Sequence, residues 1–189
     1  MRSFASYLSL AFAASLLAAC SSNIASNLDT RQNAGPCPSV GSIYDVSRYV
    51  KFADADGELY SNIDYSAEIV DVRLFCRYVE DEPMRVELDI DFAFGKGPSA
   101  TGDAHTYPYF VSVTRRSGKV LGKQSFEVAA DFEGDRVAAK TESVNDIVIP
   151  RIDESISGAN FEILVGFELT EDQLAFNRAG KRFRLNAED

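Results

Sequence analysis

The clearest hydrophobic pattern in the chain is an alternation of apolar and polar residues with a period of two. Between positions 84 and 94 the apolar members are Met84, Val86, Leu88, Ile90, Phe92 and Phe94, and the residues between them are mostly charged. The same alternation returns from Phe161 to Leu169. A strand with one apolar and one charged face is typical of an antiparallel sheet that covers a core on one side only.

Weaker alternation predicts further strands. One covers positions 44–52, and another covers 65–78, where the apolar parity switches at Val70 and therefore indicates a bulge. A hairpin is expected from Tyr109 to Val128 around the turn Ser117-Gly118. After a turn at 133–135, a further strand is expected at 137–149.

One short helix is predicted near the C-terminus. Thr170 and Gln173 fit a capping box, and Gly180 suits the position after the helix end. A last strand is expected around Phe183 and Leu185. Seven or eight strands with few helices predict an all-β fold, an antiparallel β-sandwich of the immunoglobulin or fibronectin kind. A closed lipocalin-like barrel with a ligand cavity is the alternative.

The N-terminus has the layout of a secretion signal. Arg2 is followed by an uncharged apolar stretch from Leu8 to Ala19, which is shorter than the roughly 20 residues that span a bilayer. The following residues, Leu17-Ala18-Ala19-Cys20, resemble the lipobox of bacterial prolipoproteins. That resemblance implies cleavage before Cys20 and acylation of this residue, and Ser21 after it favours the outer membrane. The alternative is an ordinary signal peptide with a cysteine near its cleavage site.

The chain is thus expected to have three parts. Residues 1–19 form the lipoprotein signal peptide, residues 20–36 the lipidated cysteine with a flexible tether, and residues 37–186 the β-sandwich domain. In an oxidising periplasm Cys37 and Cys76 are expected to form a disulfide, and their spacing is far from C-x-x-C. If the first two strands pair antiparallel, these cysteines lie close together. Two buried free thiols are the alternative.

Charge restricts the partners. The chain has 19 Lys+Arg and 29 Asp+Glu. Removal of the signal peptide with Arg2 leaves a net charge of 18 − 29 = −11. This balance argues against nucleic acid and against tight docking of the domain on anionic lipid. Two basic clusters nevertheless occur: a hairpin cluster and a C-terminal cluster. Their members are Arg115, Arg116, Lys119 and Lys123, and Arg178, Lys181, Arg182 and Arg184. We expect them to contact an anionic envelope partner, such as an envelope protein, a lipid phosphate or a glycan; solvated surface charge is the alternative.

Motifs for catalysis and metal binding are weak. His105 follows Ser99 and Asp103 in a Gly- and Ser-rich stretch that misses the G-x-S-x-G spacing, so we expect a surface-loop histidine. Asp54, Asp56 and Glu58 do not fit an EF-hand loop, and Gly95-Lys96-Gly97 does not fit a P-loop. The sequence therefore predicts neither a cofactor nor a catalytic residue, and a non-EF-hand calcium site remains an alternative for the acidic loop.

Two segments of the body, TYPYFVSVTRR and NFEILVGFELT, resemble small proteobacterial lipoproteins, a resemblance that carries no functional residues with it. The prediction is a lipid-anchored envelope protein in the outer membrane, facing the periplasm and acting as a non-enzymatic binding or structural module. A barrel that carries a lipid or small ligand and a hydrolase of envelope glycan or peptide are the alternatives.

Overall fold

The computed structural model describes residues 35–53, 57–78, 82–152 and 155–181. All of them belong to Asn33–Asp189, the second of the two compact units into which the chain divides. The predicted signal peptide, Cys20 and most of the tether lie outside the described residues. The same is true of Asp54, Asp56, Arg182, Arg184 and the strand expected around Phe183.

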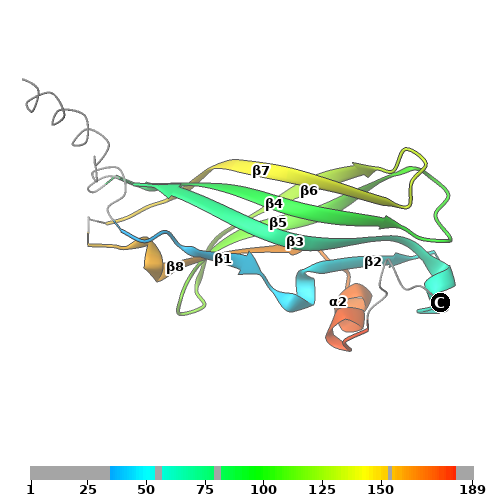
Figure 1. Ribbon diagram of the computed structural model, residues 1–189. Helices are drawn as coiled ribbons and strands as arrows, with labels where there is room; N and C mark the ends of the chain where they lie inside the picture. Colours follow the sequence, from blue (N-terminus) through cyan, green and yellow to red (C-terminus); the bar gives the residue numbers. More distant parts are fainter. Residues whose placement is uncertain (1–34, 54–56, 79–81, 153–154, 182–189) are drawn as a thin grey trace, which may run out of the picture. The chain divides into compact units, whose positions relative to one another are not determined.

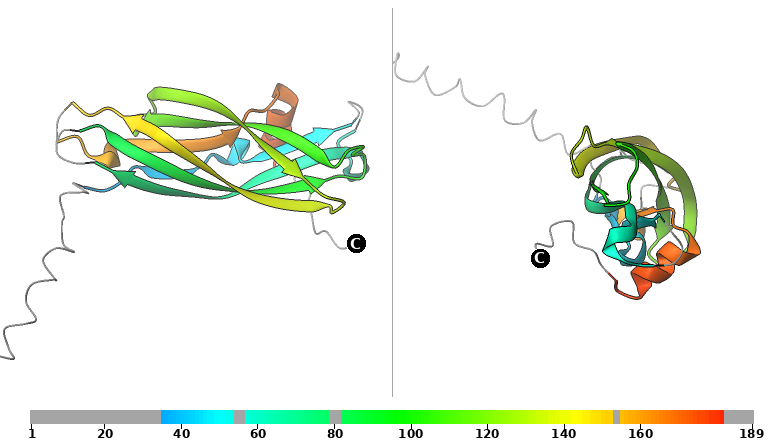
Figure 2. Two further views of the ribbon diagram at one scale, coloured as in Figure 1. Left: turned by 90° about the horizontal axis from the view of Figure 1, so that it is seen from above. Right: turned by 90° about the vertical axis from the view of Figure 1, so that its right-hand side faces the viewer.

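The described chain forms two four-stranded sheets packed face to face (Figures 1 and 2). One sheet has the order β1 (Ser39–Ser42), β8 (Phe161–Phe167), β5 (Ala104–Arg115), β6 (Val120–Asp131). The other has the order β2 (Arg48–Phe52), β3 (Ile63–Arg77), β4 (Met84–Lys96), β7 (Val137–Ile149). Every pairing is antiparallel except that of β1 with β8, which is parallel. The predicted β-sandwich is confirmed, and the described strands do not close into a barrel.

The strand order is a finding that the sequence left open. An immunoglobulin constant-type domain places its third strand in the sheet opposite the first two. Here β2, β3 and β4 follow one another in one sheet, and the β5–β6 hairpin belongs to the other. The chain therefore crosses between the sheets from β1 to β2, from β4 to β5, from β6 to β7 and from β7 to β8.

Side chains from both sheets fill the space between them. The six apolar positions of β4 that alternate along the sequence are each at most 1% exposed. Phe94 lies 4.9 Å from the ring of Tyr107 in β5, and Phe92 lies 5.2 Å from that of Tyr109. The core thus consists of the inward positions that the alternation predicted.

The bulge predicted in the second long strand is present in β3. The register against β4 shifts between Ile69 and Asp71, which leaves Val70 unpaired and 64% exposed. Before this point Tyr65, Ala67 and Ile69 are buried; after it Cys76 is buried. The extra residue thus returns the apolar side chains to the core face.

The prediction of one strand over positions 44–52 is wrong. Tyr44–Val46 forms a short 3-10 helix, and only Arg48–Phe52 is a strand. The reason is that the chain changes sheets here: β1 pairs with β8 in one sheet, whereas β2 pairs with β3 in the other.

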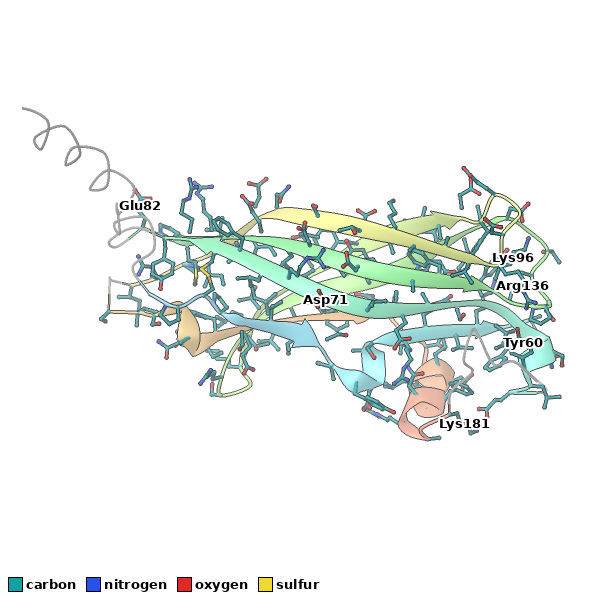
Figure 3. The ribbon with its side chains drawn as sticks, in the orientation of Figure 1. Tyr60, Asp71, Glu82, Lys96, Arg136 and Lys181 are labelled. Carbon is teal, nitrogen blue, oxygen red and sulfur yellow. A yellow bond between two sulfur atoms is a disulfide. The ribbon has the colours of Figure 1, made fainter. Side chains whose placement is uncertain are left out.

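Cys37 and Cys76 are joined as a disulfide, with their Cα atoms 5.7 Å apart. Cys37 precedes β1 and Cys76 lies near the end of β3, so the bond links the two sheets. We call the end of the sandwich that contains Cys37, Cys76 and Met84 the disulfide end. The far end contains Ile63, Lys96 and Val137. Figure 3 shows the disulfide near Glu82, with Tyr60, Lys96 and Arg136 at the far end.

The predicted helix is α2 (Glu171–Arg178). Thr170 and Gln173 form both hydrogen bonds of the capping box. Gly180 follows the C-cap residue Ala179 and has φ +71°, a conformation that glycine adopts without strain.

Candidate functional site

A cleft of about 710 Å³ lies between strand β2 and helix α2. Tyr49 and Lys51 of β2 line one side, and Gln173 and Phe176 of α2 line the other. Glu168, which directly follows β8, completes the wall on the side of the first sheet. The cleft therefore lies where elements from both ends of the described chain meet.

Helix α2 is held at the open edge of β2 by side-chain amides. Because β2 is an edge strand, its outward carbonyl groups have no neighbouring strand to bond. Gln173 Nε2 donates to the carbonyl oxygen of Val50 at 2.8 Å, and Asn177 Nδ2 donates to that of Arg48 at 2.8 Å. Phe176, 3% exposed, packs in a cluster with Val50. The helix thus covers the strand edge and forms the wall of the cleft.

Charges of both signs border the cleft. Lys51 Nζ lies 2.8 Å from Asp64, and this hydrogen-bonded ion pair raises the pKa of Lys51. Glu168 accepts a hydrogen bond of 2.6 Å from Ser125 and lies 3.2 Å from Lys123, and both contacts lower the pKa of Glu168. These groups therefore stay charged at neutral pH.

His105 lies behind the cleft in a cluster of tyrosines. Its Nε2 is 3.4 Å from the hydroxyl of Tyr49, and its ring stacks on Tyr65 with centroids 4.3 Å apart. The ring of Tyr107 meets it edge-on at 4.7 Å. Partial burial lowers the pKa of His105, and the nearby charge of Lys51 lowers it further. The imidazole is therefore neutral at pH 7.

The expectation that His105 is a surface-loop histidine is wrong. It lies within β5, which begins at Ala104, earlier than the alternation around Tyr109 predicted. His105, Tyr107 and Tyr109 then occupy every second position of the strand, and the two tyrosines are at most 2% exposed. The histidine shares their inward face and is half-buried because it stands near the strand end.

The other polar residues around His105 are engaged elsewhere. Ser99 Oγ donates to the carbonyl oxygen of Ser61 at 2.7 Å, and Asp103 forms an ion pair with Lys96. Ser99 and Asp103 therefore do not assemble with His105 into a catalytic triad.

The acidic loop is described only in part. Asp54 and Asp56 lie outside the described residues, and Glu58 forms an ion pair with Lys181. Within the described ranges, no group of three or more His, Cys, Asp or Glu side chains is arranged to hold a metal ion.

The two basic clusters lie apart. Arg115, Arg116 and Lys119 surround the β5–β6 turn beside Phe161, the first residue of β8, whereas α2 follows the last residue of this strand. The seven residues of β8 span about 23 Å. The clusters therefore do not form one continuous surface.

The cations of the C-terminal cluster that the structure describes are paired within the domain. Arg178 lies 3.2 Å from Asp45, and Lys181 pairs with Glu58. Arg182 and Arg184 lie outside the described residues. The other predicted partner-binding residues are the hairpin cations Arg115, Arg116 and Lys119. These are exposed and form no ion pair with the described residues.

Sequence reasoning missed the cleft because its walls come from distant segments. It identified Gln173 only as a capping residue, whereas this amide also binds Val50, 123 positions earlier in the chain. The apolar run Leu174-Ala175-Phe176 within a short helix was the one available signal, and it does not reveal which strand the helix covers.

The described part of the chain contains no helix with the length and apolar character needed to cross a membrane. No family model, curated protein or solved structure matches this chain.

Proposed function

We propose that this protein is a lipid-anchored component of the cell envelope that binds another envelope component in the cleft between β2 and α2. Binding rather than catalysis is its role in this proposal. The observation that carries it is the cleft itself, an open space of about 710 Å³ lined by both apolar and polar side chains and bordered by fixed charges. Ligand sites typically combine an apolar lining with a few placed polar groups.

The N-terminal sequence supports the anchor. The segment Leu17-Ala18-Ala19-Cys20 resembles a lipobox, and sixteen mostly polar residues separate Cys20 from Cys37. As a flexible coil, these residues would span roughly 20–25 Å. Ser21 directly after the cysteine favours the outer membrane, and the proposed orientation is toward the periplasm.

The position of the cleft suits such an anchor. The described chain begins at the disulfide end, where Cys37 is bonded to Cys76. Along β3, Cys76 stands eleven positions after Tyr65, which pairs with Lys51 of the cleft. Eleven residues of extended strand span about 36 Å. A domain tethered at the disulfide end would therefore present the cleft away from the membrane.

Two features favour recognition over chemistry. His105 is not among the residues that line the cleft, and its ring is held by three tyrosines. The charged groups Lys51, Glu58 and Glu168 on the cleft wall each pair with a neighbour. Such a wall offers oriented hydrogen-bonding groups without a free nucleophile or base among these residues.

Blocking the cleft tests the binding site. Ala175 is exposed on α2 and lines the cleft, and Ala175→Arg would fill this space with a side chain that helices accept well. Ala139→Arg, at an exposed position of β7, adds the same charge and volume outside the cleft. After crosslinking in cells, Ala175→Arg should lose the partner that wild type and Ala139→Arg retain. Equal capture by all three proteins would show that the cleft is not the binding site.

The anchor is tested separately. Cys20→Ser should leave the precursor uncut by the lipoprotein signal peptidase and abolish attachment through the acyl chain. Normal processing and firm membrane retention of this variant would exclude Cys20 as the lipidated residue.

A further inference from the structure

The β5–β6 hairpin carries three exposed cations in a small space. The turn is closed by a 2.8 Å hydrogen bond from Gly118 N–H to the carbonyl oxygen of Arg115, and Gly118 has φ +83°. Arg116 N–H donates to Asn160, which fixes the hairpin against the start of β8. Arg115, Arg116 and Lys119 are exposed around this tight turn, and the guanidinium of Arg115 lies 5.8 Å from the centroid of the Phe161 ring. Their positive charges are therefore concentrated at one point of an acidic protein.

Exposed apolar side chains lie at the same end of the sandwich. Val120 and Leu121 directly follow the turn and are 58% and 42% exposed. Ile152, at 86%, is the most exposed large apolar side chain of the described chain. Ile152 follows Arg151, whose guanidinium lies 4.5 Å from the ring of Tyr78 near the disulfide. The disulfide end thus combines cations with apolar side chains, the composition of a membrane-interface surface.

The chain also enters the domain at this end. The hydroxyl of Tyr78 donates to the carbonyl oxygen of Pro36 at 3.3 Å, and the disulfide holds the next residue, Cys37. Gly158 lies close against Pro36, two residues before the Asn160 that binds the hairpin. The first described residues and the hairpin are therefore held at one end by the same small group of contacts.

We propose that the disulfide end is a membrane-docking surface for anionic phospholipid. Arg115, Arg116 and Lys119 contact lipid phosphates, and Val120, Leu121 and Ile152 enter the headgroup region. This inference rests on the proposed lipid anchor at Cys20. Each Lys or Arg at an anionic surface strengthens binding roughly fivefold.

The acidic character of the whole chain determines how this surface works. A net charge of −11 for the chain without its signal repels an anionic membrane, and Glu82 adds negative charge at the same end. The acyl chain supplies the attachment, and the short tether keeps the domain at high effective concentration near the surface. The hairpin cations then select one orientation, in which the far end and the cleft point away from the lipid.

Hydrogen exchange of the full acylated protein on vesicles tests this orientation. The protein is reconstituted on vesicles of phosphatidylcholine alone and of phosphatidylcholine mixed with phosphatidylglycerol. Amides of residues 115–121 should exchange at least about fivefold more slowly on the anionic vesicles, and high salt should remove the difference. The turn at 133–135 is at the far end beside Arg136 and should exchange equally on both (Figure 3).

Two charge-matched variants complete the test. Arg115→Ser/Arg116→Ser should abolish the slower exchange, and Arg136→Ser/Lys140→Ser, which removes two positive charges elsewhere, should keep it. If the protein stays on both kinds of vesicle but residues 115–121 exchange equally, the docking surface is wrong and the anchor stands. If the protein is retained on neither, the anchor fails, and both the proposed attachment and this inference fall with it.

Discussion

Removal of the disulfide should cause a large loss of stability. The perturbation is Cys37→Ala/Cys76→Ala, which opens a loop between residues separated by 39 positions. This loop contains β1, β2 and most of β3, so it includes strands from both sheets. Without the bond, the unfolded chain gains the freedom that the loop closure had removed.

The magnitude follows from the loop length. In the chain-entropy model, a closed loop of about 40 residues stabilises the folded state by roughly 4 kcal/mol. For a domain of about 150 residues, each kcal/mol shifts the melting temperature by about 2–4 °C, so the variant should melt about 8–16 °C lower. Cys76 is fully buried, and its loss from the core adds to this cost.

Urea denaturation of wild type and variant, followed by circular dichroism, measures the effect. A reductant should lower the stability of wild type most of the way to that of the variant and leave the variant unchanged, and the remaining difference measures the loss of packing at Cys76. A loss below about 1 kcal/mol would refute the loop-entropy reasoning. Such a result would mean that the unfolded chain is already compact between these residues.

Three further predictions concern the site and the core. Because folding lowers the pKa of His105, the histidine of the unfolded chain takes up a proton at a higher pH than that of the folded chain. The free energy of unfolding should therefore fall as the pH drops below about 6.5. His105→Gln should remove this part of the pH dependence, as measured by urea midpoints; an unchanged profile would exclude His105 as its cause. Asn177→Ala leaves the carbonyl oxygens of Asp45 and Arg48 without their donor, so it should lower the free energy of unfolding by about 1–3 kcal/mol. Amide hydrogens of α2 and β2 should then exchange faster. Unchanged exchange would contradict the role given to the side-chain amide of Asn177. A Cβ on Gly97 would overlap the carbonyl oxygen of Ile63, so Gly97→Ala should lower the free energy of unfolding by about 1–3 kcal/mol in thermal unfolding. A Cβ on Gly122 meets no atom within 4 Å, so Gly122→Ala should not lower it. Equal stability of the two variants would refute the clash.

Local pattern was sufficient wherever one face of an element is wet. The alternation in β4 and β8 predicted which side chains are buried, because a strand exposed on one face reveals its core residues at every second position. The parity switch at Val70 located the bulge for the same reason. The capping box at Thr170 and Gln173 is a contact over three residues, so it too was readable.

The sequence pattern failed where the chain changes sheets and where a side chain is covered by other strands. Positions 44–52 have the apolar spacing of one strand, but only Arg48–Phe52 is a strand, and the 3-10 helix at Tyr44–Val46 carries the chain from β1 in one sheet to β2 in the other. His105 continues the alternation of Tyr107 and Tyr109, but the Gly- and Ser-rich residues before it suggested a loop, and its cover comes from Tyr49 and Tyr65 on other strands.

The sequence by itself determined the class of fold, the inward face of most strands, the helix and the pairing of the two cysteines. Each depends on periodicity, on turn chemistry or on the small number of partners available. Only the tertiary structure decided the strand order, the docking of α2 on β2, the cleft and the separation of the two basic clusters. These depend on contacts between residues far apart in the chain, such as Val111 with Val165 and Gln173 with Val50, and packing in three dimensions selects such contacts without leaving a local pattern.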